Sequence, residues 1–138
     1  MKTYLTNSEK ETKKIAALLS KQFDNGLIAL TGELGTGKTT FVQGFAKGLG
    51  ITEKIISPTF VLIRHHGFGK DRTLFHIDLY RLEDSLNIKE LGLEEIWSNP
   101  KNLVLIEWAE KIEKLLPENA LKIKIEKREN NARLITLS

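Results

Sequence analysis

The sequence contains no cysteine among its 138 residues, which excludes disulfide bonds and thiolate metal sites. It also lacks an apolar run of membrane-spanning length, and its first twelve residues, MKTYLTNSEKET, contain no apolar signal segment. We find no repeat, low-complexity segment or linker. A chain with 41% hydrophobic residues can bury a core, so we expect one soluble, cytoplasmic domain over residues 1–138 with no membrane contact.

A strong excess of charge of one sign is also missing. The 21 basic and 18 acidic residues leave a formal net charge of +3, and both kinds are dispersed along the chain. Nucleic-acid-binding domains usually carry a clustered basic patch. The sequence alone therefore does not predict direct binding to a nucleic acid.

The most informative stretch is TGELGTGKTT at residues 31–40, which follows the apolar run LIAL. Its spacing satisfies G-x-x-x-x-G-K-[ST], the phosphate-binding P-loop, whose glycines let backbone N–H groups surround an anion. Lys38 is placed to reach the β- and γ-phosphates, and the Thr39 hydroxyl is placed to ligate Mg²⁺. The predicted nucleotide-binding residues in this loop are Gly32, Glu33, Leu34, Gly35, Thr36, Gly37, Lys38, Thr39 and Thr40.

Hydrophobic periodicity predicts the setting of this loop. A Ser8–Glu11 capping box indicates an opening helix, and the tail alternates apolar and polar residues in two runs separated by RENNA. The predicted helices lie at about 8–23, 38–49, 86–97 and 110–116, and the predicted strands at 27–30, 60–63, 73–77, 103–107, 121–127 and 133–137. This order predicts an α/β fold: a three-layer, P-loop NTPase-like domain with a mixed central sheet and a C-terminal β-hairpin.

Two carboxylates follow apolar strands. Glu107 ends the run LVLI, the position from which a Walker B acid reaches the magnesium site, although an ordinary strand-end acid would face solvent there. Asp78 follows a second apolar strand, and alternation places His76, Asp78 and Tyr80 on one face if that strand continues. We predict Lys38, Asp78 and Glu107 as catalytic residues and Thr39 and Glu107 as magnesium ligands. A direct role for His76 or Tyr80 is no better supported than simple packing in the core.

The segment SPT at 57–59 fits either a switch-like loop, in which the Thr59 hydroxyl meets the γ-phosphate or its magnesium, or a plain turn. Arg81 fits either an internal arginine finger or an ion pair at an interface. Thr59 is included among the predicted nucleotide-binding residues.

Missing motifs narrow the class of nucleotidase. No N-K-x-D element for guanine recognition is present, which argues against a GTPase, and no LSGGQ-like segment indicates a transporter ATPase. The glycine-rich stretch HHGFGKDR at 65–72 offers only two cations for a kinase lid.

The motifs GELGTGKTTF, SPTF, HIDLYRL and LIEW, in this order and spacing, resemble the bacterial TsaE family over nearly the whole chain. The resemblance implies a small ATPase that acts on the TsaB–TsaD pair in the synthesis of threonylcarbamoyladenosine in tRNA. It implies ATP and Mg²⁺ as cofactors, and contact with tRNA only indirectly, through the complex.

The resemblance also implies residue roles. Lys38 would bind phosphate, Thr39 and Glu107 would form the magnesium site, and Asp78 would support hydrolysis. Trp108 would pack near the site. The base pocket is poorly marked, and Thr12, Arg128 or Arg133 fit its lining.

Two other classes of function remain open. The protein fits a small-molecule kinase, whose acceptor would raise turnover and become phosphorylated. It also fits a nucleotide-dependent binding module in which slow hydrolysis is incidental.

Overall fold

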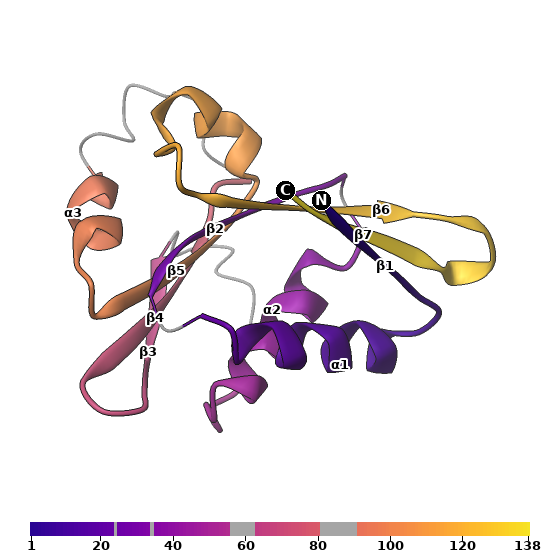
Figure 1. Cartoon of the computed structure of the whole chain (residues 1–138), viewed down its shortest axis with the longest axis horizontal. Helices are drawn as coiled ribbons and strands as arrows, with labels where there is room; N and C mark the ends of the chain where they lie inside the picture. The colour runs from indigo at the N-terminus through magenta and orange to yellow at the C-terminus, as the bar shows by residue number, and fades with distance from the viewer. Residues whose placement is uncertain (24, 34, 56–62, 81–90) are drawn as a thin grey trace.

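The computed structural model describes residues 1–23, 25–33, 35–55, 63–80 and 91–138. Within these residues a seven-stranded sheet forms the middle of the molecule, in the strand order β1-β7-β6-β2-β5-β4-β3 (Figure 1). The strands are β1 (Lys2–Thr6), β2 (Gly26–Thr31), β3 (Ile63–Phe68), β4 (Arg72–Asp78), β5 (Asn102–Glu107), β6 (Leu121–Lys127) and β7 (Arg133–Leu137).

Helices cover both faces of the sheet. One face carries α1 (Glu9–Ser20) and α2 (Lys38–Gly48), and the other carries α3 (Leu93–Ser98) and the 3₁₀ helix η2 (Ala109–Leu115) (Figure 1). A second 3₁₀ turn, η3 (Glu129–Asn131), joins β6 to β7. Each helical layer buries its own apolar cluster against the sheet. The predicted three-layer α/β fold is thus confirmed.

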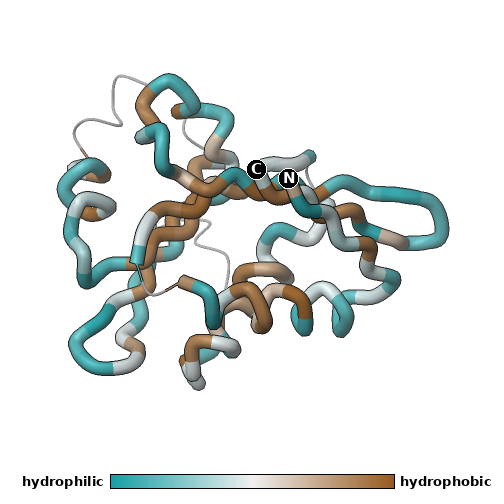
Figure 2. The backbone as a smooth tube through the Cα atoms, viewed as in Figure 1, coloured by the Kyte–Doolittle hydropathy of each residue, from teal (hydrophilic) through white to brown (hydrophobic). Residues whose placement is uncertain are grey.

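The sheet is mixed, as predicted. Strand β2 pairs in parallel with β5 and β6, and β4 pairs in parallel with β5, whereas β1–β7, β6–β7 and β3–β4 are antiparallel. Every residue of β5 is buried, because helices cover this central strand on both faces. The hydropathy of the chain follows this arrangement: the central strands are apolar and the tip of the β6–β7 hairpin is hydrophilic (Figure 2).

Parallel pairing brings three strand ends to one edge of the sheet. In the register of the strands, Glu107 lies beside Leu30 on one side and Asp78 on the other. The chain leaves β2 at this edge and enters α2 through the glycine-rich loop. In α/β sheets this edge is where ligands bind.

Helices α1 and α2 pack very closely. The space where a Cβ of Gly44 would stand is only 2.5 Å from the Cα and carbonyl oxygen of Lys13, so only glycine fits at this crossing. The predicted cap of α1 is present, because the Ser8 hydroxyl accepts a hydrogen bond from the Glu11 amide at 3.1 Å. The Glu11 carboxylate accepts from the Asn7 amide, one residue before the cap.

Several elements differ from the sequence predictions. The sequence does not predict strand β1, because its five residues, KTYLT, show no clear alternation of apolar and polar side chains, and the strand forms by pairing with β7. The glycine-rich stretch 65–72 is only partly a turn, because β3 continues through Phe68 and β4 begins at Arg72. Helix α3 begins after its N-cap Gly92, and the first five residues of the helix predicted at 86–97 lie outside the described residues.

Two further differences concern the ends of elements. The predicted helix at 110–116 is the 3₁₀ helix η2, broken by non-helical dihedral angles at Ile112. Strand β4 ends at Asp78, so the predicted shared face does not extend to Tyr80, which is exposed. No helix among the described residues is long and apolar enough to cross a membrane.

Candidate active site

The loop between β2 and α2 is held in a compact shape. At Gly32 the backbone has φ +143°, and a Cβ would stand 2.5 Å from the Ile125 carbonyl oxygen, which only glycine can accommodate. The Thr36 hydroxyl donates a hydrogen bond to the Glu33 carbonyl at 2.9 Å. Gly37 is the N-cap of α2 and adopts a left-handed conformation. The helix therefore starts with its N-terminus beside the loop, where its dipole favours an anion.

Lys38 folds back over this loop. Its side chain is buried, with 6% of the residue exposed, and Nζ donates hydrogen bonds to the carbonyl oxygens of Gly32 and Glu33, the latter at 3.1 Å. Nζ also lies 3.9 Å from the centre of the Trp108 ring, within the range of a cation–π contact. The ammonium group is thus held at the loop by weak neutral acceptors that an anion can replace.

The electrostatic environment of Lys38 has two opposing parts. Burial lowers the pKa of Lys38 below its ordinary value of 10.5, because removal from water disfavours the charged form. The carboxylates of Glu110, Glu107 and Asp78 act in the opposite direction and limit the fall in pKa. The lysine therefore sits in the field of three acids while its recorded hydrogen bonds go to backbone carbonyls.

Glu107 meets the first turn of α2. The Thr39 hydroxyl donates to Glu107 Oε1 at 3.2 Å and lies 3.5 Å from Oε2. Only 2% of Glu107 is exposed, so it is not a solvent-facing strand-end acid. Directly after it the chain turns sharply, since Trp108 has φ +60°. Thr39 and Glu107 are 68 positions apart in the sequence, and the β2–β5 pairing brings them together.

His76 also contacts Glu107. Its Nε2 lies within hydrogen-bond distance of Glu107 Oε2, and the histidine is completely buried. The sequence does not distinguish a direct role for this histidine from core packing. The available signal is its position two residues before Asp78 on the same face of β4, but alternation does not show which neighbouring strand supplies a partner.

Asp78 lies beside Glu107 at the end of β4. It is 7% exposed, and its Oδ1 accepts a hydrogen bond from the Tyr80 amide at 2.9 Å. The Tyr80 ring lies 5.1 Å from the Trp108 ring, between ring centres. The structure thus brings together all three predicted catalytic residues, Lys38, Asp78 and Glu107.

Three residues are candidates for the base pocket. Arg133 of β7 lies at the loop, where its Nε donates to the Thr36 carbonyl at 2.9 Å. Thr12 is buried and its hydroxyl is hydrogen-bonded to that of Thr6 at 2.7 Å. Arg128 lies on the exposed β6–β7 turn. Arg133 alone among these three has a contact with the loop that the structure records.

The other predicted site residues lie around this centre or outside the described residues. Glu33 and Gly35 are exposed, and Thr40 is partly buried in the first turn of α2. Leu34, the loop residue Thr59 and Arg81 lie outside the residues that the structure describes, as do the first three positions of the strand predicted at 60–63.

The oxygen donors at this edge fit a magnesium ion in kind. A hydroxyl and a carboxylate, those of Thr39 and Glu107, are hard oxygen ligands of the type that Mg²⁺ prefers. No group of three or more histidine, cysteine or acidic residues able to hold a metal occurs in the described part of the chain. Mg²⁺ is typically held by one or two carboxylates with water and substrate phosphates, and these two residues match that mode.

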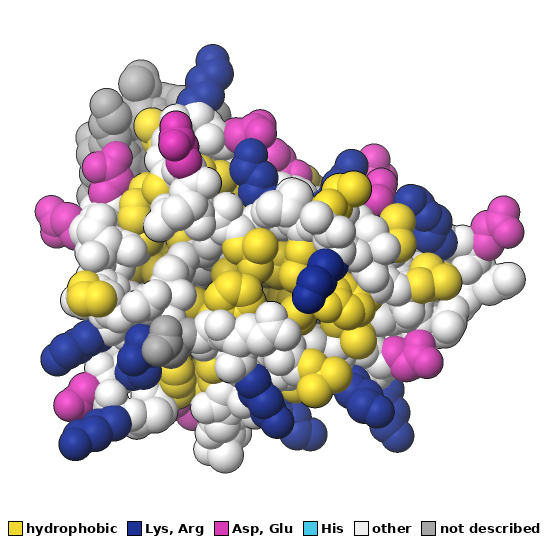
Figure 3. Space-filling model, in the orientation of Figure 1, with side chains coloured by type: hydrophobic (Ala, Val, Ile, Leu, Met, Phe, Trp, Pro, Cys, Tyr) yellow, Lys and Arg dark blue, Asp and Glu magenta, His cyan; other side chains and the backbone are white. Residues whose placement is uncertain are grey.

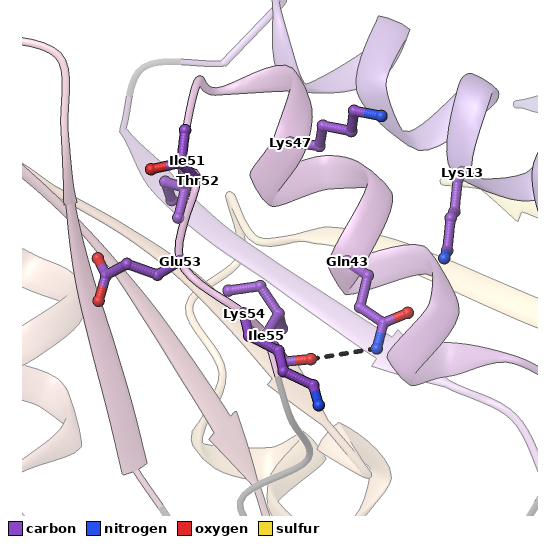
Figure 4. Close-up of a pocket in the computed structure, with 8 residues that line it drawn as sticks. All are labelled: Lys13, Gln43, Lys47, Ile51, Thr52, Glu53, Lys54 and Ile55. Carbon is purple, nitrogen blue, oxygen red and sulfur yellow. Dashed lines mark hydrogen bonds between the residues drawn. The ribbon is translucent and has the colours of Figure 1, made fainter.

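A separate pocket of about 450 Å³ lies toward the other end of α2. Its wall combines Lys13 of α1, Gln43 and Lys47 of α2 and the segment 51–55, and the Gln43 amide donates to the Ile55 carbonyl at 3.1 Å (Figure 4). The lysine side chains of this pocket point in different directions and do not converge (Figure 4). Lysine and arginine side chains also line the lower edge of the molecule, along α1 and α2, as isolated surface groups (Figure 3).

The chain is similar to known proteins over most of its length. The family model described as "Threonylcarbamoyl adenosine biosynthesis protein TsaE" matches residues 6–135. A protein of Bacillus subtilis named tRNA threonylcarbamoyladenosine biosynthesis protein TsaE is 42% identical over 96% of this chain and 82% of its own length. A protein of the same name from Rickettsia conorii is also 42% identical, over 95% of this chain and 74% of its own length.

A solved structure has the same fold. The crystal structure of Bacillus subtilis YdiB superposes with a TM-score of 0.82 at 36% sequence identity, covering 99% of this chain and 83% of that one. The likeness extends across the sheet and both helical layers, since it covers nearly the whole of this chain.

Proposed function

The chain belongs to the TsaE family of tRNA threonylcarbamoyladenosine biosynthesis proteins, and from this premise we propose that it binds and hydrolyses ATP with Mg²⁺. The hydrolysis would act on the TsaB–TsaD transferase pair, so that the protein serves tRNA modification without modifying tRNA itself. The proposal includes a cytoplasmic location, where ATP and tRNA are available.

The observation that carries the proposal is the hydrogen bond between Thr39 and Glu107, at 3.2 Å. It joins the hydroxyl of the P-loop to the acid at the end of the neighbouring parallel strand. These are the two positions from which P-loop nucleotidases hold Mg²⁺. The buried Lys38 beside them supplies the cation that such enzymes direct at phosphate.

Each residue would have a distinct task. Lys38 would exchange its bonds to the Gly32 and Glu33 carbonyls for the phosphate oxygens, and the N-terminus of α2 would add its dipole. Thr39 and Glu107 would hold the magnesium ion. The bound ion would neutralise charge on the β- and γ-phosphates. Asp78, one strand away from Glu107, would orient the attacking water.

Activity in the isolated chain would be low. The residues of the predicted switch-like loop, with Thr59, would complete the site when a partner binds, a mode of control common among P-loop proteins. Contact with tRNA would then be indirect, through the TsaB–TsaD complex.

Steady-state ATP hydrolysis tests the proposal. We would measure phosphate release by the protein alone and with purified TsaB and TsaD from the same organism, with the Lys38→Ala variant as control. Stimulation by the pair that is lost in the variant supports a partner-gated ATPase. If binding to TsaB–TsaD requires ATP but leaves the rate of hydrolysis unchanged, the protein is a nucleotide-dependent binding module and not a partner-gated ATPase. If a small molecule becomes phosphorylated, the protein is a kinase.

A further inference from the structure

His76 lies in β4, between β5 and the edge strand β3, next to the proposed magnesium site. It is fully buried in β4, opposite Leu105 of β5 in the strand register, and its ring extends toward Glu107 two residues farther along β5. Glu107 Oε1 accepts from Thr39, while Oε2 is held by His76. The carboxylate is therefore fixed at both oxygens by two different elements, α2 and β4.

The hydrogen bond pairs one nitrogen of the imidazole ring with a carboxylate oxygen. With Glu107 ionised, as a magnesium ligand must be, His76 Nε2 is the donor of this bond, because a carboxylate only accepts. The other ring nitrogen, Nδ1, is buried and has no hydrogen-bond partner within the residues that the structure describes. Glu107 is thus the only recorded partner of this buried ring among those residues, and burying a polar group without a partner carries a large cost. A side chain serving only to fill space would be apolar, as its neighbours on this face, Leu74 and Leu105, are.

We propose that His76 is a positioning residue, which holds Glu107 in the orientation that leaves its other oxygen for Thr39 and a magnesium ion. The inference rests on the proposed function, because the orientation matters only if this pair binds the ion. A glutamate side chain has three rotatable bonds, and a buried partner removes the alternatives in which the carboxylate turns away. Such partners of metal-binding carboxylates typically change metal affinity or activity about 10–100-fold when they are removed.

Two substitutions separate positioning from packing. His76→Gln keeps an N–H donor near the position of Nε2, whereas His76→Met has a similar length and no donor. We would titrate each variant with a fluorescent ATP analogue, once with Mg²⁺ and once with EDTA. In His76→Met we expect the gain in affinity from Mg²⁺ to fall about tenfold, with the affinity in EDTA unchanged within about twofold. His76→Gln should recover most of the gain.

Several outcomes would overturn the inference. One is a His76→Met variant that keeps the full gain from Mg²⁺, and another is a loss of affinity of equal size with Mg²⁺ and with EDTA. His76→Gln behaving like His76→Met would also do so, since it would show that the donor is irrelevant. A wild-type protein whose affinity is the same with Mg²⁺ and EDTA would instead remove the proposed function, and the inference with it.

A spectroscopic measurement covers the case in which His76→Met does not fold. The chain has three histidines, so nitrogen-15 spectra of histidine-labelled protein can assign each ring. We expect His76 as the Nε2–H form, with resonances that shift in Glu107→Ala while those of His65 and His66 stay in place. An unshifted His76, or one protonated on Nδ1 only, would overturn the inference.

Discussion

Helix α2 carries a lysine near each end, and the two lysines differ in burial and in the groups around them. At the N-terminal end Lys38 is buried, bonds to the loop and faces Trp108. At the C-terminal end Lys47 is exposed, and the pocket beside it has lysines that point apart (Figure 4). A hollow lined by lysines is therefore not by itself a chemically organised site.

This difference shows what the parallel sheet contributes. Only the N-terminal end of α2 lies at the edge where β2, β4 and β5 end, so only there do buried groups from several strands meet. Burying a polar group without a hydrogen-bond partner is costly, and at this edge the buried polar groups serve as partners for one another. The C-terminal end packs against α1, where a Cβ of Gly48 would stand 2.6 Å from the Ala17 carbonyl oxygen, and Lys47 beside it is exposed.

The largest expected effect comes from replacing each lysine with alanine. We expect Lys38→Ala to lower ATP affinity at least about thirtyfold, because a buried cation that meets a charged ligand is worth about 2–5 kcal/mol. Lys47→Ala, the matched control on the same helix, should stay within about twofold of wild type. Isothermal titration calorimetry measures both. Equal losses in the two variants would remove the distinction between the two ends of α2.

Next in size is the effect of Glu107→Ala on turnover. We expect the rate of ATP hydrolysis to fall about 10–100-fold, since Glu107 is proposed to hold the ion that neutralises charge during the reaction. ATP affinity measured in EDTA should change by less than about fivefold, because the lysine and the loop remain, while the gain in affinity from Mg²⁺ should fall at least as much as in His76→Met. Single-turnover kinetics with a separate binding measurement resolves the two effects. Loss of binding and hydrolysis in equal proportion would contradict the separate roles of Lys38 and Glu107.

The loop at the N-terminal end of α2 can be predicted from the sequence, because the residues that indicate it are close together in the chain. The glycine and lysine spacing, the apolar run before it and the helical period after it all occur within 27–49. The acids Asp78 and Glu107 are readable because each ends an apolar strand. What places them side by side is parallel pairing, which follows from the strand order that a three-layer fold imposes.

The missing pieces depend on partners distant in the chain. Strand β1 has no clear alternation, and it is ordered by pairing with β7 at the other end of the sequence. The contacts of His76 with Glu107 and of Arg133 with Thr36 join residues 31 and 97 positions apart. A single sequence shows which residue types are present, but it does not show which residues distant in the chain come into contact.

A third prediction concerns the middle of α2, between its two ends. Alanine normally stabilises a helix interior relative to glycine by about 1 kcal/mol. We expect Gly44→Ala to destabilise the fold by about 1–3 kcal/mol instead, because its Cβ would stand 2.5 Å from the Lys13 backbone and force α1 away. Urea denaturation measures the change in the free energy of unfolding.

A second glycine, in an uncrowded position, distinguishes a steric clash from the general effect of replacing glycine with alanine. The Cβ position of Gly67 in β3 has its nearest neighbour at 3.9 Å, so Gly67→Ala should change stability by less than about 0.5 kcal/mol. If Gly44→Ala proved as stable as wild type, the two helices would have room between them and α2 would not be clamped against α1.

The smallest expected effect is the pH dependence of stability that burial gives to Lys38. The pKa of Lys38 is lowered in the folded protein, so between the folded pKa and 10.5 the unfolded chain binds more protons at this residue than the folded one. Its contribution to stability is therefore present above pH 10.5 and is lost as the pH falls through the folded pKa. Between the folded pKa of Lys38 and pH 10.5, this residue should therefore make the free energy of unfolding of the protein rise with pH.

Nucleotide-free wild type and Lys38→Met, which cannot titrate at this position, reveal the effect. The free energy of unfolding of wild type relative to Lys38→Met should increase as the pH rises toward 10.5. The opposite slope for Lys38 would mean that Glu110, Glu107 and Asp78 outweigh burial and raise its pKa. In that case the lysine would be anchored by the acids of the site, and a phosphate would have to compete with them for it.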